Sequence, residues 1–114
     1  MTRFPLQTVL LLLACLVPAF AEMRVTQPDA MRAAVKKTQP EYNPIARQMH
    51  VQGDVEIEAR VSDSGEVIEV KVLSGNALLT ASVVKAVKVW RFQPFQENGK
   101  PIQAVAILRF TFKI

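Results

Sequence analysis

The stretch that decides the fold runs from Leu78 to Phe95 and reads LLTASVVKAVKVWRFQPF. Its apolar residues recur at helical spacing, which predicts an amphipathic helix that ends in the aromatic Trp90. Asn76 is placed to cap the start of this helix. Pro94 has no amide proton, so the helix cannot continue past it. The chain before this stretch predicts a hairpin on which the helix packs, and the chain after it predicts one more strand.

Residues 51–73 change the hydrophobic period to two, which is typical of β-strands. In the first strand charged side chains alternate with the apolar residues Val55, Ile57, Ala59 and Val61. Ser62 to Gly65 predicts a turn, in which Gly65 supplies the positive φ that such turns often need. The partner strand, Glu66 to Leu73, again places apolar residues on one face. These two strands predict a hairpin with one half-buried face.

A last strand is predicted from Pro101 onward, after a polar loop that turns at Asn98-Gly99. One face of this strand is wholly apolar and carries Ala104, Ala106, Leu108, Phe110 and Phe112. The other face carries Gln103, Val105, Ile107, Arg109, Thr111 and Lys113. The apolar face is expected to pack against the helix and Trp90.

These elements predict a two-layer α+β fold, with a three-stranded antiparallel sheet packed on one main helix. The last strand can run parallel to the strand before the crossover helix by pairing antiparallel with the first, which gives the strand order 2-1-3. The last strand is then an edge. A short N-terminal helix is expected over Ala30 to Lys37, with Asp29 as its cap, and a second one over Ile45 to His50.

Residues 1–21 have the pattern of a secretory signal peptide, with a basic start, an apolar run over Val9 to Val17 and Ala-Phe-Ala at 19–21. The apolar run is shorter than the roughly 20 residues that span a bilayer. Two other fates stay open, namely acylation of Cys15 as in a lipoprotein and an uncleaved anchor that begins at Phe4. Cleavage predicts an exported, periplasmic chain, in which residues 22–38 are a lead-in segment and residues 39–114 form the domain.

The sequence offers little for catalysis, and we predict a protein that is not an enzyme and uses no metal or cofactor. His50 is the only histidine and has no cysteine near it with which to share a metal. Glu56 and Glu58 follow strand alternation, which indicates a solvated face more than a pair of catalytic carboxylates. The mild excess of basic residues and the export signal argue against nucleic acid as a partner.

The remaining feature is the edge of the last strand, whose backbone N–H and C=O groups are expected to be unpaired. In one interpretation, Arg109, Lys113 and Pro101 protect this edge and nothing binds there, or two copies of the chain pair edge to edge. In the other, an extended peptide adds to the sheet as a further strand by β-augmentation. The residue pattern by itself does not choose between them.

Five motifs, in order, resemble the C-terminal domain of TonB proteins. The first is QPEYNPIAR at 39–47, which is similar to the family pattern Q-P-x-Y-P-x-x-A-R. It is followed by QGDV at 52–55, DSGEV at 63–67, VLSG at 72–75 and VWRFQP at 89–94, and the chain closes on a strand that ends Phe-Thr-Phe. The resemblance covers roughly residues 35–114.

The resemblance implies a module that captures a segment of an outer-membrane transporter as a strand added beside the last strand. It implies that Gln39 and Pro40 flank this peptide and that the backbone of Val105, Ile107, Arg109 and Thr111 binds it. It also implies that the aromatic and apolar residues of the motifs are structural. We expect these core residues to be Tyr42, Val83, Trp90, Phe92, Leu108, Phe110 and Phe112.

The chain departs from the family pattern in two ways. Asn43 stands between the tyrosine and the proline, which changes the backbone close to the expected peptide. A proline-rich spacer of the kind by which TonB crosses the periplasm is also missing, so the chain resembles the C-terminal module alone. The expected partners are segments of envelope proteins, foremost TonB-dependent outer-membrane transporters. The alternatives are a structural homodimer and a short, membrane-anchored energy transducer.

Overall fold

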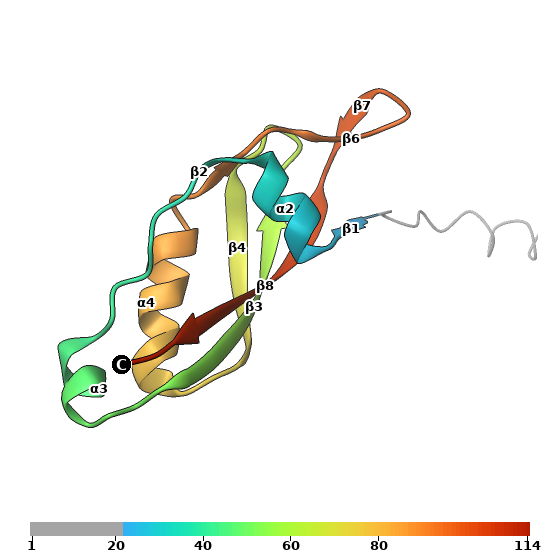
Figure 1. The fold of residues 1–114 in the computed structure, drawn as a ribbon. Coiled ribbons are helices and arrows are strands. Elements are labelled where there is room, and N and C mark those ends of the chain that lie inside the picture. Colours follow the sequence, from blue (N-terminus) through green and yellow to red (C-terminus); the bar gives the residue numbers. More distant parts are fainter. Residues whose placement is uncertain (1–21) are drawn as a thin grey trace, which may run out of the picture.

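The computed structural model describes residues 22–114, so the predicted signal peptide lies outside the described residues. Its centre is a four-stranded sheet with the order β1-β8-β3-β4 (Figure 1). The central strand β3 (Gly53–Val61) pairs antiparallel with β4 (Val67–Ser74) and with β8 (Ala104–Phe112). The register aligns Ile57 with Leu108 on one side and with Val72 on the other. The three strands predicted from the sequence are therefore neighbours in the expected order.

One helix, α4 (Ala77–Val87), covers one face of this sheet and closes the core (Figure 1). The alternation in β3 puts four apolar side chains out of contact with solvent, namely Val55, Ile57, Ala59 and Val61. They share the core with Leu79, Val83 and Val87 of α4 and with Ala104, Ala106 and Leu108 of β8. Period-two strands and a period-3.6 helix thus bury their apolar residues against each other, which makes a two-layer α+β fold.

Helix α4 begins where the sequence predicts and ends earlier. The side chain of Asn76 accepts a hydrogen bond from the amide of Leu78 at 2.9 Å, as an N-cap does. After Val87 the backbone tightens, because Trp90 donates its amide to the carbonyl of Val87 at 3.0 Å instead of to Ala86. The helix therefore does not reach Trp90, and the prediction of its end was wrong.

The sheet has a fourth strand, which corrects the prediction of a three-stranded antiparallel sheet. Strand β1 (Met23–Val25) lies in the expected lead-in segment and pairs parallel with the start of β8. The N-terminal helix is also displaced, since α2 spans Gln27–Ala33 and is capped by Thr26. The expected last turn of this helix is instead strand β2 (Ala34–Lys36), which pairs with β5 (Arg91–Phe92). A partner strand 55 to 58 positions further along the chain thus overrides the local helical pattern.

The remaining elements are short. Helix α3 spans Pro44–Gln48, two residues shorter at its end than predicted. Strands β6 (Phe95–Glu97) and β7 (Lys100–Ile102) form a small hairpin. Its two turn residues, Asn98 and Gly99, both have positive φ, which matches the twist of paired strands. No helix within residues 22–114 is long and apolar enough to cross a membrane.

Candidate peptide-binding edge

The outer edge of β8 is divided into an occupied half and an open half. In the occupied half, β1 lies beside residues 104–106, and the amide of Met23 donates to the carbonyl of Gln103 at 3.2 Å. Val105 is paired with Arg24 on one side and Arg60 on the other, and only 2% of it is exposed. The prediction that β8 is an edge along its whole length is therefore wrong for residues 104–106. Val105 is out of reach of any ligand while β1 is in place.

Beyond β1 the edge of β8 meets the side chain of Gln27. The amide of Arg109 donates to Oε1 of Gln27 at 3.2 Å, and Nε2 of Gln27 donates to the carbonyl of Arg109 at 3.1 Å. The backbone groups of Arg109 therefore point away from β3. Since outward-pointing residues alternate along an antiparallel strand, the backbone groups of Ile107 and Thr111 point outward as well.

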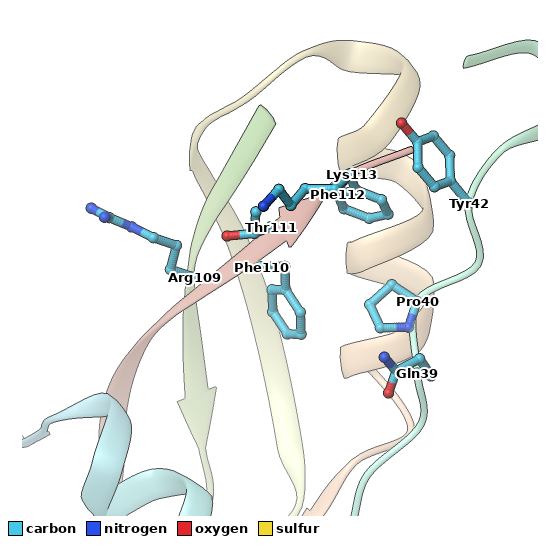
Figure 2. A pocket seen from close by; sticks show the side chains of 8 residues that line it. All are labelled: Gln39, Pro40, Tyr42, Arg109, Phe110, Thr111, Phe112 and Lys113. Atoms are coloured by element: carbon cyan, nitrogen blue, oxygen red, sulfur yellow. The ribbon is translucent and has the colours of Figure 1, made fainter. Parts of the chain in front are cut away.

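The open half of the edge, which lies beyond Arg109, faces a groove of about 330 Å³. One wall is the end of β8, and the other is the extended linker that follows β2 (Figure 2). The lining residues are Gln39, Pro40, Tyr42, Arg109, Phe110, Thr111, Phe112 and Lys113. The structure thus brings together Gln39, Pro40, Arg109 and Thr111, while Ile107 lies outside the lining and Val105 is covered by β1.

The side chains of Arg109 and Thr111 are held on the outer face of the sheet and do not block this edge. Arg109 forms an ion pair with Glu56 on β3, with 3.0 Å between Nη2 and Oε2. Thr111 forms a hydrogen bond between Oγ1 and Oδ1 of Asp54 at 2.7 Å. In Figure 2 the side chain of Arg109 accordingly points away from the linker, whereas Phe110 lies on the side of the linker. The backbone at Thr111 is therefore not covered by these side chains, whereas that of Arg109 is bonded to Gln27.

Aromatic residues of the family motifs fix the linker wall. The hydroxyl of Tyr42 donates to the carbonyl of Val51, and its ring meets Phe112 edge to face with 5.3 Å between centroids. The indole Nε1–H of Trp90 donates to the carbonyl of Thr38 at 2.9 Å, and its ring lies 5.8 Å from that of Phe110. These contacts connect the linker to Trp90, which follows α4, and to β8. The width of the groove is therefore set by packed side chains and not by a free loop.

The expected core residues fall into two groups. The buried ones are Val83, Trp90, Phe92, Leu108 and Phe112. Tyr42 and Phe110 are only half-buried and also line the groove, so they belong to both the packing and the site. Sequence reasoning missed Gln27 altogether, because an isolated glutamine carries no periodic or motif signal.

The described residues contain no group of three or more side chains suited to holding a metal ion. His50, the one histidine, follows α3 with a φ of 58°. The amide of Val51 donates to Ala46 and that of His50 to Arg47, which is the pattern of a Schellman motif. His50 thus occupies the position after the helix where glycine is usual, which is a structural role.

Comparison with known proteins places this chain in a family. The family model described as the Gram-negative bacterial TonB protein C-terminal matches residues 38–114. The chain belongs to the TonB C-terminal family. The match begins at the linker that forms one wall of the groove and includes all of β8. It leaves out β1 and α2, the two elements that lie against the other half of the edge.

Individual relatives agree with this assignment. The chain is 32% identical over 92 residues to Protein TonB of Vibrio cholerae and 29% identical over 92 residues to Protein TonB of Escherichia coli. These alignments cover 79% of this chain and 36% of each relative, so the chain spans about a third of the length of these TonB proteins. The solution structure of the Pseudomonas aeruginosa TonB C-terminal domain superposes with a TM-score of 0.61 at 25% identity. This superposition covers 71% of this chain and 84% of that one.

Proposed function

We propose that this TonB-family domain binds extended peptide segments of envelope proteins, foremost outer-membrane transporters, by adding the peptide to the edge of β8 as a further strand. The observation that carries the proposal is the outward-facing edge of β8 beyond Arg109, where Thr111 borders a groove lined by Gln39, Pro40 and Tyr42. The backbone of Arg109 faces the same way and already bonds the peptide-like amide of Gln27. In β-augmentation, main-chain hydrogen bonds supply affinity and alternate side-chain positions supply selectivity.

The groove has the chemistry that this mode of binding requires. Phe110, Phe112 and Pro40 offer apolar surface to the side chains of a peptide, and Gln39 offers an amide. The charge of Arg109 is paired with Glu56, and Lys113 adds a positive charge at the end of the groove. Backbone groups available for strand pairing, flanked by both polar and apolar side chains, suit a binding module better than an enzyme.

The cellular setting is part of the same proposal. The pattern of residues 1–21 supports export to the periplasm, where segments of outer-membrane transporters are accessible. Membership of the TonB family supports a role linked to TonB-type transport across the outer membrane. A domain of this size would serve as the part that holds the transporter.

The test is an NMR titration with synthetic peptides that match the N-terminal ends of outer-membrane transporters from the same organism. We expect the largest shifts at residues 39–42 and 109–113. Shifts restricted to another face, such as the exposed side of α4, would overturn the proposed site. Absence of shifts with every peptide would overturn the function.

A pair of substitutions at Thr111 sharpens this test. Thr111→Pro removes an amide that points into the groove, and proline is tolerated at such an edge position. Thr111→Val keeps the amide and removes only the hydroxyl that bonds Asp54. We expect Thr111→Pro to lower affinity at least about tenfold, and Thr111→Val to change it by less than about threefold. Equal effects of both variants would mean that the backbone is not the binding element.

The same variants address self-pairing of two copies through β8, which is the alternative function. A dimer in sedimentation experiments that Thr111→Pro dissociates and Thr111→Val preserves would favour the structural module. A monomer with peptide binding favours the proposal above.

A further inference from the structure

The edge of β8 from Gln103 to Arg109 is contacted by one continuous stretch of the chain, residues 22–33, and the edge beyond Arg109 stays open. Strand β1 supplies backbone to residues 103–106, and α2, which follows it at once, supplies Gln27 to Arg109. In Figure 1, β1 and α2 lie beside β8, away from its C-terminal end. It also stands outside the 38–114 region that matches the family.

The amide group of Gln27 has the same donor and acceptor as a peptide bond. It accepts from the amide of Arg109 and donates to the carbonyl of Arg109, with both distances between 3.1 and 3.2 Å. A neighbouring strand would use the same two groups of Arg109 in a sheet ladder. Gln27 therefore takes the place of one residue of an added strand.

Residues 22–33 contact the rest of the domain through few fully buried side chains. Strand β1 has three residues, and the segment contributes two buried side chains to the core, Val25 and Ala30. Met23, Met31 and Ala33 pack against the core and are only partly buried. Glu22 adds an ion pair with Arg60. The chain is fastened again only from Ala33 onward, where the amide of Gln93 donates to its carbonyl at 2.8 Å and β2 pairs with β5. Segments with so few buried contacts open at low free-energy cost.

We propose that residues 22–33 are a built-in strand that competes with the peptide for the edge of β8. The proposal rests on the function proposed above, because it concerns the same site. With the segment docked, a peptide reaches the backbone only from the open half beyond Arg109. With the segment released, the outward backbone N–H and C=O groups of β8 are free from Gln103 to Thr111, and a longer stretch of peptide pairs with them.

This arrangement couples affinity to the docked state of the segment. The apparent dissociation constant equals the intrinsic one divided by the fraction of molecules whose edge is free. Any change that weakens docking of residues 22–33 therefore tightens binding of a peptide that pairs along the whole edge, without altering a single residue of the groove.

The experiment measures affinity for the transporter N-terminal peptides by isothermal titration, with four variants of the protein. Gln27→Ala removes both hydrogen bonds to Arg109, and Met23→Pro removes the donor to Gln103. Two controls leave the docking intact. Arg24→Pro places proline where the amide faces away from β8, since only alternate residues of a strand point to a given neighbour. Gln96→Ala removes an exposed glutamine from the β6–β7 hairpin.

We expect Gln27→Ala and Met23→Pro to tighten binding by roughly three- to thirtyfold, the range set by loss of one or two exposed hydrogen bonds. Both controls should bind as the unmodified protein does. Unchanged or weaker binding by Gln27→Ala and Met23→Pro, while the unmodified protein binds, would overturn the inference and leave the proposed function standing. No binding by any of the proteins would overturn both.

Hydrogen exchange checks the mechanism without any ligand. The amide of Arg109 is bonded to Gln27, whereas those of Leu108 and Phe110 point to β3. Gln27→Ala should speed exchange at Arg109 and, because the segment docks less tightly, at Val105, whose amide faces β1, while Leu108 and Phe110 stay unchanged. Equal exchange at Arg109 in both proteins would show that Gln27 does not cover the edge in solution, which would contradict the competing-strand mechanism.

Discussion

The indole of Trp90 donates its Nε1–H to the backbone carbonyl of Thr38 at 2.9 Å, across 52 residues of sequence. Trp90 is 2% exposed and lies just after α4, while Thr38 directly precedes the linker that walls the groove. A single buried side chain thus connects the core to one side of the candidate site. Changes at Trp90 should therefore be felt both in stability and in binding.

Trp90→Ala should lower the free energy of unfolding by about 3–5 kcal/mol, as is typical for a buried large aromatic residue. Trp90→Phe keeps a ring in the core and leaves the carbonyl of Thr38 without its donor, which should cost about 1–3 kcal/mol. Urea unfolding measures both values. We also expect Trp90→Phe to weaken peptide binding, because the linker loses its anchor. Native affinity in a folded Trp90→Phe protein would show that the groove does not depend on this contact.

Gly65 leaves no room for a side chain, because it packs against the backbone of Phe92, which cannot move aside as a side chain could. Its φ is +89°, its carbonyl accepts the amide of Phe92 at 2.9 Å, and a Cβ built on it would overlap the carbonyl oxygen of Phe92. Gly65→Ala should therefore destabilise the protein by at least about 3 kcal/mol. Gly99→Ala is the matched control, since Gly99 has a φ of +77° and open space around it. Gly99→Ala should lower the free energy of unfolding only by the cost of a positive φ for a residue with a Cβ, about 1–2 kcal/mol. Similar thermal midpoints for the two variants would contradict the steric explanation.

Asn43, the residue inserted into the family pattern, has a definite local role. Its Oδ1 accepts the amides of Ile45 at 2.8 Å and Ala46 at 3.4 Å, so it is the N-cap of α3. Asn43→Ala should lower the free energy of unfolding by about 1 kcal/mol, and Asn43→Asp should preserve it, because aspartate caps equally well. Chemical denaturation distinguishes them. A loss of stability in Asn43→Asp equal to that in Asn43→Ala would rule out capping as the reason for this residue.

His50 lies in the left-handed region at the end of α3. In this region a residue with a Cβ is strained, which lowers the stability of the folded state by roughly 1–2 kcal/mol. Glycine removes this strain, but its freer unfolded chain offsets about 0.4–1 kcal/mol of the gain. His50→Gly should therefore raise the free energy of unfolding by roughly 0.5–1 kcal/mol. His50→Ala keeps the Cβ and should give no such gain. A stability loss in His50→Gly would mean that the imidazole makes contacts that outweigh the backbone strain.

Much of the fold follows from local patterns. Alternation over 53–61 and 67–74, the cap at Asn76 and the turn at Asn98-Gly99 all appear where the sequence predicts them. Each depends on residues a few positions apart, so their periodicity or backbone preference can be read from the local sequence. The order of β4, β3 and β8 follows too, because short connections and the handedness of the crossover leave few choices.

The candidate site, too, was only partly predictable from the sequence. The sequence by itself determined the family, the central hairpin and helix, and the side of the last strand that faces away from the core. Only the tertiary structure decided that β1 and Gln27 lie against that strand, that β2 is a strand and that α4 stops at Val87. A three-residue strand has no readable period, and a glutamine amide that bonds a backbone 82 positions away is indistinguishable in sequence from a solvated one. Distant segments pair where the packed core leaves backbone N–H and C=O groups without partners. Side-chain periodicity carries no information about this pairing.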